Sequence, residues 1–181
     1  MSAAVKKPIW EEIKYWPEYH GRTEIVDGEL VMSPVPGGRH QKVCARLGVI
    51  ILPFVESRDL GDFYMHPMHV ILAEHVHYEP DLCFISKPRL HIHNEPVIEG
   101  PPDLIIEVVS ESNRTHDTVV KFRDYERYGV REYWIVDPRE EHIRVSYLEG
   151  GKYVSLGAFG RGDKVMSRVF DGLELDPAQV F

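Results

Sequence analysis

The chain has 181 residues, of which 43% are hydrophobic and 28% are charged, and its formal net charge is −8 at pH 7. This composition is typical of a globular protein and excludes collagen-like, wholly disordered and membrane-spanning classes. The longest apolar run, residues 47–55, contains a proline and is too short to cross a bilayer. We predict one domain over residues 1–181. We also expect a cytoplasmic protein, because the first residues lack the apolar core of a signal peptide.

The predicted elements begin with a short helix over Trp10–Trp16 and a β-hairpin over Thr23–Met32. Asp27-Gly28 divides two β-prone runs of this hairpin, and such a dipeptide is the strongest short-range hairpin signal. Apolar residues then recur at helical spacing from His40 to about Glu56, which predicts the first long helix. Three strand-like runs follow, at residues 62–65, 69–72 and 81–86.

The second half continues with the run Asp103–Ser110, which is apolar on both faces and therefore typical of a strand inside a covered sheet. A helix is predicted from about Asp117 to Tyr128, with Gly129 as its C-terminal cap. Further strands are predicted over residues 131–137, 143–148 and 152–156. This order predicts an α/β or α+β fold in which helices flank a mixed central sheet and a β-hairpin lies at the N-terminus.

Acids at the ends of apolar strands are the candidates for chemistry. Glu107 and Asp103 share one face of a predicted strand, but at ~3.3 Å per residue they stand ~13 Å apart and cannot hold one ion. If the strand that follows Asp81 runs antiparallel to this one, Asp81 lies beside Glu107, and Asp103 lies at the other end near Ser86. Two carboxylates on neighbouring strands suit Mg²⁺ or Mn²⁺ in phosphoryl chemistry. Lys121, early in the next helix, could reach Glu107 or form a surface pair with Asp117.

Several motifs resemble those of the Uma2 family (DUF820) over about residues 20–150. They are Glu24-Ile-Val-Asp-Gly-Glu-Leu30, Ser33-Pro34, Arg39-His40-Gln41, Pro80-Asp81-Leu82, Pro102–Ser110, Asp117, Lys121, Tyr125, Gly129-Val130 and Glu132–Pro138. The family is regarded as a restriction-endonuclease-like branch of the PD-(D/E)xK nuclease superfamily. The resemblance therefore implies a restriction-endonuclease-like core, a DNA substrate and a divalent metal.

The resemblance also implies roles for single residues. Asp81 takes the position of the metal-binding Asp, and Glu107 that of the acid in the acid-x-Lys motif. Val109 occupies the usual lysine position, so the lysine would come from the following helix as Lys121. For a further site residue, the candidates are Glu29, His40, Gln41 and Asp103.

Two other functions remain open. A non-catalytic binding or scaffolding protein with a nuclease fold is favoured by Val109 and by the net acidity, because proteins that hold DNA through its phosphates are usually basic. The pairs His75-x-His77 and His91-x-His93 would suit a β-rich, histidine-ligated metalloprotein. Cutting both DNA strands needs two sites, which is compatible with a homodimer.

Overall fold

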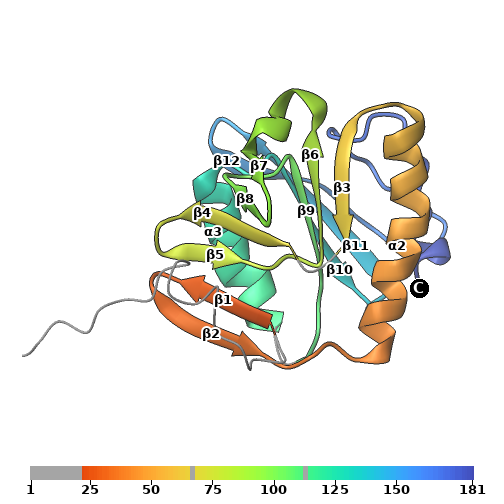
Figure 1. Cartoon of the computed structure of the whole chain (residues 1–181). Coiled ribbons are helices and arrows are strands. Elements are labelled where there is room, and N and C mark those ends of the chain that lie inside the picture. Colours follow the sequence, from red (N-terminus) through yellow and green to blue (C-terminus); the bar gives the residue numbers. More distant parts are fainter. Residues whose placement is uncertain (1–21, 66–67, 112–113) are drawn as a thin grey trace, which may run out of the picture.

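Strands make up most of the regular structure in the computed structural model, which describes residues 22–65, 68–111 and 114–181 (Figure 1). Up to residue 99 the elements are β1 (Arg22–Val26), β2 (Glu29–Ser33), α2 (Gly38–Ser57), β3 (Gly61–Met65), β4 (His69–Ala73), β5 (Val76–Tyr78), β6 (Leu82–Ser86), the 3-10 helix η1 (Lys87–Ile92), β7 (His93–Asn94) and β8 (Val97–Glu99). The remaining elements are β9 (Leu104–Val108), the π-helical turn η2 (His116–Val120), α3 (Lys121–Tyr128), β10 (Glu132–Asp137), β11 (His142–Glu149), β12 (Lys152–Phe159) and the 3-10 helix η3 (Pro177–Gln179).

The central sheet has six strands in the order β12-β11-β10-β9-β6-β3. It is mixed, because β9 and β10 run parallel while β6 runs antiparallel to β9. The register pairs Leu82 with Ile106 and Phe84 with Leu104. The predicted antiparallel arrangement of these two strands is therefore confirmed, and so is the mixed central sheet.

A second six-stranded sheet, in the order β2-β1-β5-β4-β8-β7, begins with the predicted hairpin. The hairpin turns at Asp27 and Gly28, whose φ angles are 50° and 80°. The sequence did not predict this sheet as a separate layer, nor the strands β5, β7 and β8. These strands have only two or three residues each, too few to show an alternating pattern.

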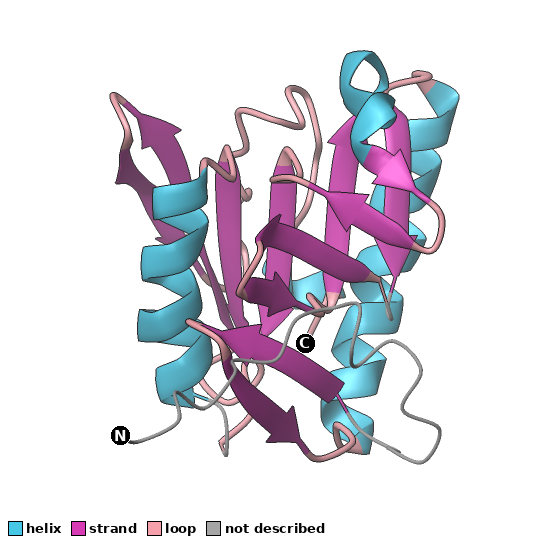
Figure 2. Ribbon diagram, turned by 60° about the vertical axis from the view of Figure 1, so that its left-hand side comes forward, coloured by secondary structure: helices cyan, strands magenta, loops and turns pink. Residues whose placement is uncertain are grey.

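Alternate residues of the central strands face two different apolar clusters. Leu104, Ile106 and Val108 pack with α2 and the C-terminal segment, whereas Ile105 and Val109 pack with α3 and the second sheet. Figure 2 shows the strands of the central sheet between the two helices, with the second sheet in front. The polar residues of the second face are thus enclosed between layers.

Helix α2 confirms the predicted first helix almost to the residue. The second predicted helix begins differently, because residues 116–120 form a π-helical turn and α3 starts only at Lys121. Gly129 caps α3 with φ of 88°, as the sequence predicts. The predicted helix Trp10–Trp16 lies outside the described residues. No helix in the described part of the chain is long and apolar enough to cross a membrane.

Candidate active site

The two acids that the sequence paired approach each other at the same edge of the central sheet. Asp81 directly precedes β6, and Glu107 lies near the end of β9. Because Leu82 pairs with Ile106 in antiparallel register, Asp81 and Glu107 stand opposite each other. Both side chains are buried. A buried carboxylate needs cations or hydrogen-bond donors, and the surrounding elements supply them.

Arg22, at the start of β1, lies between these two carboxylates. Its Nη2 atom forms a short ion pair with Oδ1 of Asp81, and its Nη1 lies 3.5 Å from Oε2 of Glu107. The other Asp81 oxygen, Oδ2, accepts a hydrogen bond from the backbone N–H of Val108 at 2.7 Å and lies 3.0 Å from Nε2 of His40. Asp81 is therefore fixed on both oxygens.

Lys121 reaches the same site from the first turn of α3. Its Nζ atom lies 2.8 Å from Oε1 of Glu107 and 2.8 Å from Oε1 of Glu24, a residue of β1. The Lys121 side chain is 1% exposed. Asp117 also faces it at 3.5 Å, so the i,i+4 pair exists but is buried and not on the surface. Lys121 thus joins acids from the central sheet, the second sheet and the π-helical turn.

Further donors complete the cluster. The hydroxyl of Tyr125 donates to Oε1 of Glu107 at 3.0 Å, as the placement of this ring on the Lys121 face of the helix allows. Nε2 of His116 lies 2.7 Å from Oε2 of Glu24. By contrast, Oε2 of Glu107 is buried and has no hydrogen-bond donor among the described residues.

The two facing acids have pKa values shifted in opposite directions. Burial raises the pKa of Asp81, but the hydrogen bond from His40 and the charge of Arg22 outweigh burial and hold it well below its ordinary value. For Glu107, burial outweighs Lys121, and the charges of Asp81 and Asp117 add to it, so its pKa is raised. Such a divergence is common where titratable groups share a functional site.

His40 is the one additional candidate from the first helix that enters the site. Its Nδ1 atom lies 3.6 Å from Sγ of Cys44, one helical turn further along α2. Within the described residues, His40, Cys44 and Asp81 are the only group with at least three His, Cys, Asp or Glu ligands close enough to hold a metal ion. Neither of the His-x-His pairs belongs to such a group among those residues.

The other additional candidates lie elsewhere. Asp103 is at the opposite end of β9, where it accepts a hydrogen bond from the backbone of Ser86 at 2.7 Å and pairs with Arg89 and Arg131. Its position agrees with the predicted register. Glu29 and Gln41 are exposed, and no side-chain contact joins either of them to the acid cluster in the described part of the chain. Val109 is buried in the apolar cluster of the second face.

Sequence reasoning missed Glu24 and Arg22 as site residues. Both belong to β1, which lies in the second sheet, so no strand register of the central sheet could place them. One signal was present: Glu24 opens a motif shared with the Uma2 family, and it precedes the Asp27-Gly28 turn. A buried acid in a hairpin strand indicates a partner across the layer.

Comparison with known proteins places the chain in a family. Residues 10–178 match the Uma2 family, described as "putative restriction endonuclease". A crystal structure of a "putative nuclease belonging to DUF820" from Anabaena variabilis is similar, with a TM-score of 0.79 and 19% identity over 96% of this chain and 97% of that one. No curated protein matches. At this identity the structural likeness shows the fold, whereas the match over nearly the whole chain shows that the protein belongs to the Uma2 family.

Proposed function

We propose that this protein is a metal-dependent nuclease that hydrolyses phosphodiester bonds in DNA. The observation that carries the proposal is the buried Lys121, whose Nζ lies 2.8 Å from carboxylate oxygens of both Glu107 and Glu24. Asp81 stands opposite Glu107 on the neighbouring strand. In phosphodiester hydrolysis a water oxygen bonds to phosphorus, the bond to the leaving oxygen breaks, and negative charge spreads over the phosphate oxygens. A lysine among acids that can hold a divalent cation suits this charge development.

The donor set fits Mg²⁺, with Mn²⁺ as an alternative. Asp81 and Glu107 offer hard carboxylate oxygens, and Oε2 of Glu107 is buried without a hydrogen-bond donor among the described residues. When bound, such an ion would lower the pKa of the attacking water and neutralise charge on the phosphate. Arg22 now supplies the positive charge between these two acids and would compete with the ion for Asp81.

The residues of this chain have distinct tasks in the proposal. Lys121 orients the attacking water or stabilises the charge on the phosphate, and Glu24 together with Tyr125 holds Lys121 and Glu107 in place. The N–H of Val108 and the ring of His40 fix the orientation of Asp81. These partners come from four different elements, so the orientations of the site residues are set by the fold.

The test is a nuclease assay with Mg²⁺ and with Mn²⁺ on duplex, single-stranded and branched DNA. Cleavage should disappear in Asp81→Ala, Glu107→Gln and Lys121→Met, with folding checked by circular dichroism. Asp103→Asn is the matched control for Glu107→Gln, because both acids share one face of the same strand and only Glu107 contacts Lys121. Equal loss of cleavage in Asp103→Asn and Glu107→Gln would contradict the assignment.

A second lysine position sharpens the test. Val109 shares the strand face of Glu107, so a lysine there would approach the same carboxylate from the position that most of the superfamily uses. We expect Val109→Lys to restore part of the cleavage that Lys121→Met removes, and Val109→Met to restore none. Full cleavage in Lys121→Met alone would remove Lys121 from the mechanism.

The second candidate function is a nuclease-fold protein without catalysis, and the contacts of Asp81 favour it. Both oxygens of this acid already have partners in Arg22, His40 and the backbone of Val108. If isothermal calorimetry detects no binding of Mg²⁺ or Mn²⁺ and no DNA is cut, this second function is the correct one.

A further inference from the structure

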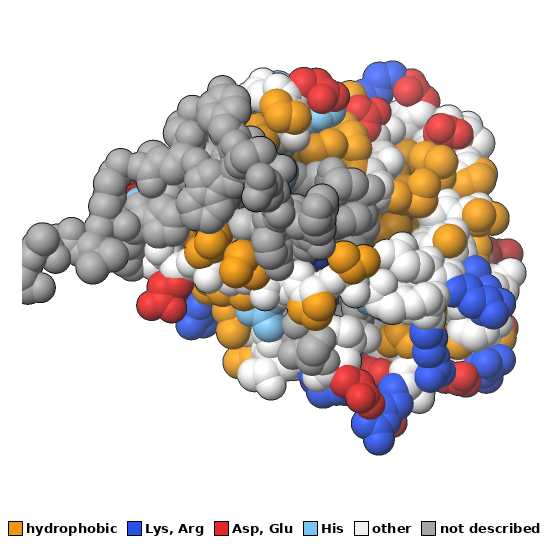
Figure 3. All heavy atoms as spheres, turned by 60° about the horizontal axis from the view of Figure 1, so that its bottom comes forward, with side chains coloured by type: hydrophobic (Ala, Val, Ile, Leu, Met, Phe, Trp, Pro, Cys, Tyr) orange, Lys and Arg blue, Asp and Glu red, His pale blue; other side chains and the backbone are white. Residues whose placement is uncertain are grey.

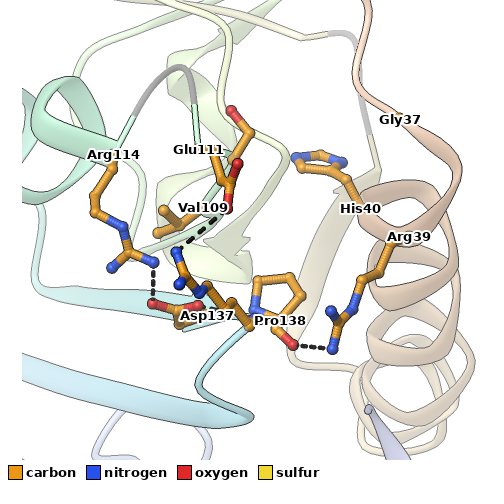
Figure 4. Close-up of a pocket in the computed structure, with 10 residues that line it drawn as sticks. Gly37, Arg39, His40, Val109, Glu111, Arg114, Asp137 and Pro138 are labelled. Carbon is orange, nitrogen blue, oxygen red and sulfur yellow. Dashed lines mark hydrogen bonds and ion pairs between the residues drawn. The ribbon is translucent and has the colours of Figure 1, made fainter.

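A cavity of about 540 Å³ lies beside the acid cluster and is lined by three arginines. We call it the arginine pocket and define it by Arg39, Arg114 and Arg139. Figure 4 shows Arg114 and Glu111 on one side of this cavity and Arg39 and His40 on the other, with Asp137 and Pro138 between them. The pocket forms where β10 ends and α2 begins, so it brings together parts of the chain about 100 residues apart in sequence, as the bond from Arg39 to Pro138 shows.

Two of the arginines are held by the turn after β10. Arg39 donates a short hydrogen bond to the carbonyl oxygen of Pro138, and Arg114 pairs with Asp137 at 2.7 Å. Asp137 also accepts hydrogen bonds from the backbone of Arg139 and Glu140, at 2.9 and 3.1 Å. Both guanidinium groups thus have partners that orient them on opposite sides of the cavity, Arg114 through a buried acid and Arg39, whose side chain is 64% exposed, through a backbone oxygen. Groups oriented in this way lower the entropic cost of binding an anion.

The third arginine, Arg139, forms only a weak ion pair. Arg139 contacts Glu111 at 3.3 Å, and the two side chains are 69% and 81% exposed. Exposed ion pairs of this kind contribute about 0–1 kcal/mol, so an entering anion displaces Glu111 at little cost. The charged residues of the lining are three arginines, Asp137 and Glu111, and Glu141 faces Arg39 at 3.8 Å from outside the lining. Three arginines are thus concentrated here in a chain of net charge −8, and an anion that displaces the exposed acids Glu111 and Glu141 takes their place.

The arginine pocket adjoins a second cavity that reaches residues of the candidate active site. A smaller cavity of about 80 Å³ reaches Arg22 and Asp117, and it shares Gly37, His40 and Ser110 with the arginine pocket. Gly37 precedes the first turn of α2, which contains no acid, so the positive end of the helix dipole adds to the same wall. Figure 3 views this end of the molecule, and most Lys and Arg side chains visible there lie along one side, interspersed with Asp and Glu.

We propose that the arginine pocket binds a backbone phosphate that neighbours the scissile one and so sets the path of a nucleic-acid strand across the site. That the neighbouring phosphate is the scissile one rests on the proposed nuclease function, whereas the binding of a phosphate in the pocket does not. Arg39, Arg114 and Arg139 contact the phosphate oxygens, and guanidinium groups suit such oxygens because of their paired N–H donors. The pocket positions the strand and reads no base sequence.

The experiment measures the affinity of the full chain for fluorescent duplex and single-stranded DNA over a series of KCl concentrations, without divalent metal. Arg139→Ala and Arg39→Ala should each weaken binding and lower the slope of log K against log salt by about one. Arg168→Ala is the matched control, because Arg168 forms a similarly exposed ion pair with Glu149 but does not line this pocket. Its affinity and slope should equal those of the unaltered protein.

A DNA whose backbone carries one uncharged linkage in place of a phosphate tests the same contact. Once a cleavage position has been mapped, one methylphosphonate is placed next to it. This DNA should bind the unaltered protein more weakly than ordinary DNA binds Arg139→Ala, because Arg39 and Arg114 lose the same phosphate charge, and Arg139→Ala should lower the affinity for this DNA no further. Additive losses would mean that the arginine and this phosphate do not meet, and would overturn the proposal.

The outcomes separate this inference from the nuclease proposal. If the protein cleaves DNA but Arg39→Ala and Arg139→Ala behave as Arg168→Ala does, the pocket is no phosphate site and the nuclease function is untouched. If nothing is cleaved but these two variants still lose affinity and salt slope, the phosphate site stands and the nuclease function fails. Displacement of the DNA by poly-glutamate as effective as that by unlabelled DNA would overturn phosphate recognition.

Discussion

Arg22 lies between the two facing acids of the site and balances their negative charge. Its guanidinium contacts both Asp81 and Glu107, which are the acids that a divalent ion would use. We therefore expect Arg22→Gln to lower the free energy of unfolding of the metal-free protein by about 3–5 kcal/mol, the usual cost of removing one partner from a buried ion pair. Mg²⁺ should then bind more tightly, because no guanidinium competes for Asp81.

Thermal unfolding with and without Mg²⁺, together with calorimetric titration, tests this expectation. The rise in melting temperature on adding Mg²⁺ should be larger for Arg22→Gln than for the unaltered protein. Arg46→Gln is the control, since Arg46 binds the carbonyl oxygens of Val180 and Phe181, far along the chain from the acids. Equal Mg²⁺ effects in all three proteins would show that Arg22 and the ion do not compete.

Glu24 makes the protein sensitive to acid. Burial raises its pKa, but the charge of Lys121 and the hydrogen bond from His116 outweigh burial and lower the pKa to about 2 from 4.5. A group with a depressed native pKa stabilises the fold above its ordinary pKa and loses that contribution as pH falls towards the native value. Between pH 4.5 and 2, Glu24→Gln should therefore lose less stability than the unaltered protein, by on the order of 3 kcal/mol.

Glu79 provides a control of opposite sign. Burial raises its pKa from 4.5 to about 7, so its contribution to stability is complete below pH 4.5 and is lost as pH rises through about 7. Urea unfolding at a series of pH values should show that Glu79→Gln gains stability relative to the unaltered protein only at the alkaline end. A parallel response of the two variants would show that burial, and not the specific partners of Glu24, decides both pKa values.

At the scale of elements, the β1–β2 hairpin carries Arg22 and Glu24 into the site. It joins the rest of its sheet through the pairing of Ile25 with His77 and the hydrogen bond from the Gly28 N–H to the His75 carbonyl oxygen. Its turn depends on Gly28, whose φ is 80°. Gly28→Val forces a β-branched residue into this conformation at a cost of about 1–3 kcal/mol. We expect faster amide exchange over residues 22–33 and a loss of cleavage with the rest of the fold intact.

A second hairpin supplies the matched control for this prediction. Gly151, between β11 and β12, has φ of 79° and follows Gly150 in a turn of the same kind. Gly151→Val meets the same backbone strain at an exposed position, whereas Gly28 is buried, so it should cost no more stability than Gly28→Val. It should leave cleavage unchanged, because no residue of that hairpin contacts Asp81, Glu107 or Lys121 in the described structure. Equal losses of activity in the two variants would mean that the hairpin acts through global stability alone.

Some elements of the fold could be predicted from the sequence and others could not. Long apolar runs and the 3.6-residue period predicted α2, β6, β9 and β10, and strand geometry placed Asp81 opposite Glu107. The second sheet could not be predicted, because β5, β7 and β8 are too short for a period and are held by pairing with distant strands. Glu24 and Arg22 were missed for a related reason. Their partners lie in another layer of the fold, and the spacing of residues along a strand does not reveal contacts between layers.

The π-helical turn escaped prediction on different grounds. Residues 116–128 have a single helical pattern, and sequence period does not distinguish one wider turn within it. This turn brings Asp117 within 3.5 Å of Lys121 and lets His116 reach Glu24. Such turns concentrate at functional sites. The local departure from regular helix thus coincides with the cluster of acids.

At the scale of the whole molecule, the chain has net charge −8 and carries one Asp81–Glu107–Lys121 cluster among its described residues. A net acidic chain is expected to attract DNA only weakly as a whole, so the proposed DNA binding would depend on local charge such as the arginine pocket and on a divalent ion. If the proposed nuclease function holds, one cluster would cut one strand at a time. A homodimer would supply the second cluster through a two-fold axis that matches the symmetry of duplex DNA.

One cluster per chain predicts the order in which the products of DNA cleavage appear. With supercoiled plasmid at low protein concentration, the nicked circle should accumulate before linear DNA, and the linear share of the first product should rise as the protein concentration favours a dimer. Gel time courses, with sedimentation under the same conditions, measure both quantities. Adding the inactive Glu107→Gln chain should lower nicking in proportion to the active fraction, but linear product with its square, because two active chains must meet. If linear DNA is the first product at concentrations where the protein sediments as a monomer, one chain cuts both strands, and the single-cluster account of this molecule is wrong.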